Sequence, residues 1–303
     1  MSDEEPERYH EWILWKLKQE RKMSEDQLEL DFTSHLGEGI TTTDSIIRRE
    51  MYEMQKHIHG LQMRIKELAE ENYELKKASI MSFLFNNSKF PDNLQSNIYS
   101  QKIDKELTHV SSILRFEYVM EFGVDSIAYF IQPKIRNNKL LIFSSGHSNT
   151  SKDVNNILDF FLKKGYDVLR IDMPLKLNNS KPTVFIDNIG PLTIGHHDRF
   201  KFLEGKVNGH PLKFFIEPVF VFLNEIKSKN QYENISMLGF SGGGWTTIVS
   251  SAINKDINYS FIVSGPQPLI YKNPNKFDCY ELSHKDFSNL VNYFDLYIMS
   301  AYG

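Results

Sequence analysis

The chain has 303 residues, of which 41% are apolar and 24% charged, so it is long and apolar enough for two domains or for one large α/β unit with an appendage. Its net charge of −4 argues against a nucleic-acid-binding body, which needs a surplus of Lys and Arg to neutralise phosphates. A single cysteine, Cys279, excludes an intramolecular disulfide and a metal site built from several cysteines of one chain.

The first residues do not resemble an export signal. Its first residues, MSDEEPERYH, are acidic, whereas a secretory signal begins with basic residues followed by an apolar run. No stretch of about 18 apolar residues occurs that could span a bilayer. We therefore expect a soluble, cytoplasmic protein without a membrane or nucleic-acid partner.

The composition divides the chain into segments. The first 80 residues are rich in Glu, Lys, Gln and Met, while the region around Pro91 is rich in Asn and Ser. Beyond it, short apolar runs alternate with helical patterns. We expect an acidic helical or disordered segment at 1–45, a coiled-coil helix at 46–78, a linker at 79–109 and an α/β domain at 110–303.

A heptad repeat runs through residues 47–75. It places two Ile and one Asn at position a and three Leu at position d, which favours a parallel two-stranded coiled coil. The repeat thus predicts a homodimer through residues 47–75. The alternative is an amphipathic helix that packs on the chain's own domain. The seam consists of Met51, Ile58, Ile65 and Asn72 at a, and of Ile47, Met54, Leu61, Leu68 and Leu75 at d.

The rest of the chain predicts an α/β fold, a mostly parallel sheet with helices on both faces. Residues 174–210 form a long connection without strong periodicity, and such connections are often functional. The sequence from Phe287 onward predicts a single terminal helix. Strands are predicted at 113–120, 126–132, 140–144, 166–172, 235–240 and 259–264, and helices at 154–162 and 218–229.

One motif carries chemistry. The strand at 235–240 runs into a predicted helix through Gly239-Phe240-Ser241-Gly242-Gly243. A G-x-S-x-G in this context resembles the nucleophile elbow of the α/β-hydrolase family, in which small residues two before and two after the serine let strand and helix approach closely. A chance match or a phosphate-binding turn is the alternative, although no Lys follows the glycines as in a P-loop.

The resemblance implies a serine hydrolase that cleaves an ester or related acyl bond of a small molecule without a cofactor. Ser241 would be the nucleophile, and the Gly242 amide would bind the oxyanion. The family's second oxyanion donor follows an earlier strand, where this chain has Gly146-His147-Ser148-Asn149. An amide of this loop, with Gly146 and His147 as candidates, is therefore expected to complete the oxyanion hole.

The general base is harder to place from the sequence. In the family, the acid and the histidine follow the serine, but here the chain ends early, and we expect the last two strands to be missing. His284 is the only histidine after Ser241, so it is either the base or a solvated helix start. His197, in GHHDRF, is expected to face the substrate rather than to bind a metal with His196, because adjacent side chains diverge.

Two further alternatives remain at this point. Asp172 ends a predicted strand and is either a catalytic carboxylate or a turn-capping residue. The combination of a heptad seam with an incomplete triad also fits a different class of protein, a non-catalytic oligomeric scaffold built from a coiled coil and a shortened hydrolase domain.

Overall fold

A computed structural model of the chain describes residues 42–87, 89–90, 95–102, 107, 109–147, 151–266 and 279–302. The chain divides into two compact units, 1–68 and 69–303. Of the acidic segment predicted at 1–45, residues 1–41 lie outside the described residues. In the part of the chain that is described, no helix combines the length and the hydrophobicity that crossing a membrane requires.

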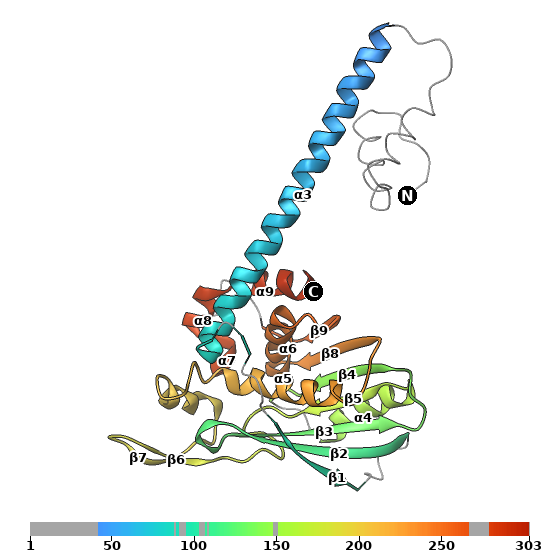
Figure 1. The fold of residues 1–303 in the computed structure, drawn as a ribbon. Coiled ribbons are helices and arrows are strands. Elements are labelled where there is room, and N and C mark those ends of the chain that lie inside the picture. Colours follow the sequence, from blue (N-terminus) through green and yellow to red (C-terminus); the bar gives the residue numbers. More distant parts are fainter. Residues whose placement is uncertain are drawn as a thin grey trace. The chain divides into compact units, whose positions relative to one another are not determined.

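The core of the second unit is a seven-stranded sheet with the order β1-β2-β3-β5-β4-β8-β9 (Figure 1). In this order, β1 with β2, β2 with β3, and β3 with β5 are antiparallel pairs. The pairs β5 with β4, β4 with β8, and β8 with β9 are parallel. Most strands therefore point in one direction, and the α/β class is confirmed. The strands are β1 (Asn97–Gln101), β2 (Val110–Val119), β3 (Asp125–Pro133), β4 (Lys139–Ser144), β5 (Asp167–Ile171), β8 (Asn234–Phe240) and β9 (Tyr259–Val263).

Helices cover both faces of this sheet, as the alternation of side chains along β4 illustrates. Leu141 and Phe143 pack with helix α4 (Ser151–Lys163) on one face. Leu140 and Ile142 belong to the larger core on the other face, together with α5 (Lys213–Lys227) and α6 (Gly242–Ile253) (Figure 1). Successive side chains of a strand point to opposite faces, so an uninterrupted apolar run such as LLIF fits a strand buried on both sides.

The first helix is longer than its heptad pattern predicts. Helix α3 runs from Thr42 to Phe85, and both its last turns and strand β1 lie within residues 79–109, which the sequence analysis assigns to a linker. The C-terminal turns of α3 bury Tyr73, Ile80 and Leu84 in the core of the second unit. At this end, the helix therefore packs on the chain's own domain, which was the alternative to a coiled coil in the sequence analysis.

The predicted seam of the coiled coil is exposed at Asn72 and at two apolar positions, Met54 at 54% and Leu75 at 63%. If the seam dimerises, the chain is expected to elute in size-exclusion chromatography with light scattering at twice its monomer mass. Replacing Met54 and Leu75 together by Glu would then give a monomer, because charges in the seam oppose association. Met63→Glu, at an equally exposed position off the seam, is the control. A wild-type monomer at micromolar concentration would contradict the predicted dimer.

Two regions differ from the sequence-based expectations. The connection at 174–210 contains a hairpin, β6 (Thr183–Ile186) with β7 (Gly190–Thr193), and a 3-10 helix, η3 (His197–Leu203). The single helix predicted from Phe287 onward is instead two helices, α8 (Lys285–Leu290) and α9 (Tyr293–Tyr302), and a short helix α7 (Tyr280–Ser283) precedes them. The last break has a local cause, because the Asn292 side chain accepts a hydrogen bond from the Asp295 amide at 3.0 Å and so caps α9.

Candidate functional site

Ser241 occupies an unusual backbone conformation at the junction of β8 and α6. Its φ of 51° and ψ of −117° lie outside the regions that non-glycine residues normally adopt. Its amide donates to the Val263 carbonyl of the neighbouring strand at 2.9 Å, and its carbonyl accepts from the Gly244 and Trp245 amides. Backbone hydrogen bonds on both sides hold the serine at the end of the strand.

The glycines around Ser241 are required by close backbone contacts. A Cβ atom on Gly243 would lie 2.6 Å from the Ser145 carbonyl oxygen and closer still to that of Ser144. A Cβ atom on Gly239 would collide with the backbone of Gly243. Strand β8, helix α6 and the end of β4 therefore meet at distances that only glycine permits, which explains the spacing of the motif.

The first turn of α6 provides N–H donors next to the serine. Helix α6 begins at Gly242, and the first N–H groups of a helix have no acceptor within the helix. The Gly244 and Trp245 amides are satisfied by the Ser241 carbonyl, and the Gly242 and Gly243 amides precede them with no backbone acceptor among the described residues. Such amides, together with the helix dipole, favour negative charge beside Ser241.

Three side chains from distant parts of the sequence meet near this turn, two of them buried and that of His147 14% exposed. His147 follows β4, His197 begins η3 and Glu281 lies in α7. His147 Nε2 lies 2.9 Å from Glu281 Oε1 and 2.9 Å from His197 Nδ1, and His197 Nδ1 lies 3.3 Å from Glu281 Oε2. The side chains of His197 and Glu281 are 1% and 0% exposed. We call these three residues the imidazole–carboxylate cluster.

The cluster touches the residue that follows the serine. A Cβ atom on Gly242 would lie 2.8 Å from Nδ1 of His147, so the imidazole packs directly against the Gly242 backbone. On its other side, His147 Nδ1 lies 3.9 Å from the Cys279 sulfur. The structure thus brings His147, His197 and Gly242 together, three residues that the sequence analysis considers separately.

The charges of the cluster support one another. Burial alone would raise the pKa of Glu281, but the two imidazoles beside it lower this pKa to about 2. Burial would lower the pKa of His147, but its contacts with Cys279 and Glu281 raise it to about 9. A carboxylate and a cationic imidazole thus lie in the interior next to the N-terminus of α6.

The other predicted site residues have different surroundings. His284 caps helix α8, where its Nδ1 accepts from the Phe287 amide at 3.4 Å, and its Nε2 lies 3.5 Å from Glu204. Asp172 is buried, follows the last residue of β5, and forms a two-pronged ion pair with Arg170 of that strand, at 2.9 and 3.0 Å. Gly146 precedes His147 in the loop after β4, and the remaining loop candidates, 148–149, lie outside the described residues.

Two members of the site, Glu281 and Cys279, are not predicted by the sequence. Both precede α8 and lie far from Ser241 and His147 along the chain. No spacing or motif links them to the elbow, because their proximity arises only when α7 packs on the residues around η3 and α6. His147 is predicted, but for its backbone amide rather than for its imidazole.

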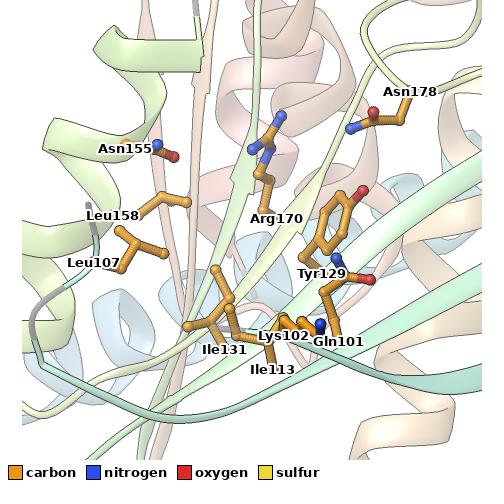
Figure 2. Close-up of a pocket in the computed structure, with 10 residues that line it drawn as sticks. All are labelled: Gln101, Lys102, Leu107, Ile113, Tyr129, Ile131, Asn155, Leu158, Arg170 and Asn178. Carbon is orange, nitrogen blue, oxygen red and sulfur yellow. The ribbon is translucent and has the colours of Figure 1, made fainter. Parts of the chain in front are cut away.

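A separate cavity of about 240 Å³ lies between the sheet and α4. Figure 2 shows its lining, which includes the polar side chains of Arg170, Tyr129 and Asn155. Neither Ser241 nor a member of the imidazole–carboxylate cluster lines it. The charge of Arg170 is already paired with Asp172, so the cavity offers a bound molecule little uncompensated charge.

Comparison with known proteins gives structural likenesses only. No protein-family model and no curated protein sequence matches the chain. Its structure is similar to that of the esterase Pf2001 from Pyrococcus furiosus, with 18% identity and a TM-score of 0.38 over 57% of this chain and 58% of the esterase. It is also similar to an acetyl xylan esterase from Paenibacillus sp. R4, with 16% identity and a TM-score of 0.43 over 78% and 72% of the two chains.

A third similar structure is acetyl xylan esterase 1 from Thermoanaerobacterium sp. JW/SL YS485, with 13% identity, a TM-score of 0.42 and coverage of 64% of this chain and 59% of that enzyme. The chain therefore spans less than two thirds of the length of the Pyrococcus and Thermoanaerobacterium esterases. The function is argued below from the residues of the site itself.

Proposed function

We propose that the chain is a serine hydrolase that cleaves an ester or a related acyl bond through Ser241. The observation that carries the proposal is the positive φ of Ser241, a non-glycine residue fixed between a central strand and the start of a helix. Such strain costs about 1–3 kcal/mol and is kept mainly where function uses it. In this conformation a serine hydroxyl stands at the end of the strand, as in the nucleophile elbow.

The chemistry follows from the groups around the elbow. The Ser241 oxygen would attack the acyl carbon, and the carbonyl electrons would move to the oxygen as the new bond forms. The Gly242 amide would stabilise this oxyanion, with the His147 imidazole packed against the Gly242 backbone. The alcohol would then leave with a proton, and water would release the acyl group.

The serine proton must pass to a base, since a serine hydroxyl is a weak nucleophile at neutral pH. His284 is the candidate from the sequence. Its two ring nitrogens already have partners, the Phe287 amide and the Glu204 carboxylate. A variant must therefore test whether His284 accepts the serine proton. His284→Gln is expected to slow acylation of Ser241 more than about a hundredfold if His284 is the base.

Labelling with a fluorophosphonate tests the proposal without knowledge of the substrate. The folded wild-type chain is expected to react covalently with the probe, and Ser241→Ala is expected to remain unlabelled, because the probe reacts only with an activated serine. Circular dichroism of both proteins controls for folding. Labelling of Ser241→Ala at the wild-type rate would show that another residue reacts, and the proposal would be wrong.

A second candidate function is a non-catalytic oligomeric scaffold. The exposure of the seam residues Met54 and Leu75 favours it, because such side chains are suited to contact a second helix. A folded dimer that the probe does not label would support the scaffold over the hydrolase.

A further inference from the structure

The imidazole–carboxylate cluster has the geometry of a small ion site. His147 Nε2, His197 Nδ1 and the Glu281 oxygens lie 2.9, 2.9 and 3.3 Å apart. A tetrahedral ion with bonds of about 2.0–2.1 Å keeps its ligand atoms about 3.3 Å from one another. Shifts of about 0.4 Å would therefore let all three side chains bind one ion.

Contacts on the far side of each ring orient the imidazoles. His197 Nε2 lies 2.7 Å from the Pro174 carbonyl, which can only accept, so this nitrogen carries a proton. In the neutral ring, Nδ1 then points a lone pair toward His147 and Glu281. His147 Nδ1 faces the Cys279 sulfur, so its Nε2 likewise faces the cluster. Metal-binding histidines commonly donate their second N–H in this way, which fixes the tautomer.

Within the described residues, the groups that compensate the carboxylate of Glu281 are the two imidazoles of the cluster. Both of its oxygens are buried, and neither receives a well-directed hydrogen bond, although imidazole nitrogens lie within ion-pair distance. Ion pairs offset only part of the free-energy cost of burying a carboxylate. A cation between Glu281 and the two imidazoles would compensate it.

We propose that His147, His197 and Glu281 bind one divalent transition-metal ion of the zinc type. Two imidazoles and one carboxylate form the ligand set that suits zinc and its neighbours, whereas Mg²⁺ and Ca²⁺ prefer oxygen ligands alone. Cys279 lies beside His147, and its sulfur is within 4.8 Å of the ligand atoms of His147 and Glu281. The side chain of His147 is 14% exposed, so the cluster reaches the solvent on that side.

Binding is measured on the full chain after treatment with a chelator. Titration calorimetry is expected to show one Zn²⁺ per chain with a dissociation constant of about 1 μM or tighter, and no binding of Mg²⁺ or Ca²⁺ in the same range. Co²⁺ is expected to give the strong visible absorption of tetrahedral coordination. If the wild-type chain binds neither Zn²⁺ nor Co²⁺, the cluster holds protons only and the proposal is wrong.

Variants locate the ion. Glu281→Gln keeps the shape of the side chain and is expected to weaken Zn²⁺ binding more than about a hundredfold, as is His197→Gln. His196→Gln is the matched control, because His196 is the neighbouring residue but its side chain is 56% exposed and lies outside the cluster. Unchanged binding in Glu281→Gln would overturn the proposal.

A second group of possible ligands requires its own variant. Glu204, His210 and His284 also bring potential ligand atoms together, within 4.8 Å of one another. His210→Gln is expected to leave Zn²⁺ binding unchanged, and loss of binding in this variant but not in Glu281→Gln would place the ion elsewhere and contradict the proposal. If Glu281→Gln fails to fold, two other measurements test the proposal. These are the loss of Zn²⁺ binding in His197→Gln and the Co²⁺ spectrum of the wild-type chain.

The metal site does not depend on the proposed hydrolase function. Ser241 supplies none of the ligand atoms, so Ser241→Ala is expected to bind Zn²⁺ as the wild-type chain does. Metal binding by a chain that the fluorophosphonate does not label would support the metal site and contradict only the proposed hydrolase function. Labelling without metal binding would support the hydrolase function and contradict the metal site.

Discussion

Ester hydrolysis is expected to fall at least about a thousandfold when Ser241 is replaced by alanine. The substitution removes the oxygen that forms the covalent acyl intermediate and leaves only binding and oxyanion stabilisation, which alone give a small part of the rate enhancement. Initial rates with a panel of p-nitrophenyl esters of short acids measure this effect. The backbone of Ser241 is set by its hydrogen bonds to Val263 and Trp245, so the variant should fold.

Ser250→Ala is the matched control for this prediction. Ser250 lies in the same helix, is buried, and its hydroxyl makes no hydrogen bond within the described residues. Its removal is expected to leave hydrolysis unchanged. Equal rates for wild type and Ser241→Ala would mean that the acyl group is transferred elsewhere, with the Cys279 thiol beside His147 as the first residue to examine.

Gly243→Val is expected to destabilise the fold by about 3 kcal/mol or more, a large part of the stability of a typical domain. Its Cβ would lie 2.6 Å from the Ser145 carbonyl oxygen and closer to that of Ser144. Both are backbone atoms, so the strand and the helix must separate and expose core residues such as Trp245, which is fully buried. Urea denaturation followed by tryptophan fluorescence measures the loss.

Gly195→Val serves as the control for the effect of adding a side chain. No atom lies within 4 Å of a Cβ atom at Gly195, so its replacement is expected to change the free energy of unfolding by less than about 0.5 kcal/mol. If Gly243→Val and Gly195→Val were equally stable, the close packing of β8, α6 and β4 described here would be wrong.

Much of the sheet could be predicted from the sequence, because its signals are local. The run Leu140 to Phe143 is apolar on both faces, and β4 is indeed buried on both. The pair of strands around Gly123 was likewise predicted, and β2 pairs with β3 in a hairpin. The glycine spacing around Ser241 indicates a strand–turn–helix junction, since steric limits at such a turn depend on adjacent residues only.

The imidazole–carboxylate cluster could not be predicted in the same way. Glu281 meets His147 and His197 because α7, the loop after β4 and the start of η3 converge, and no local pattern encodes that convergence. The break between α8 and α9 was also missed, since an apolar stretch conceals the capping Asn292. Neither the long-range contacts of the cluster nor the side-chain cap at Asn292 changes the periodicity of apolar residues, from which the elements are predicted.

The most direct test of covalent catalysis by Ser241 is the mass of the chain during turnover. Protein quenched with acid while it hydrolyses an aryl ester is expected to carry one acyl group, and peptide mapping is expected to place that group on the peptide containing Ser241. An acyl group on Cys279 or His147, or hydrolysis without any acylated chain, would contradict the assignment of Ser241 as the nucleophile.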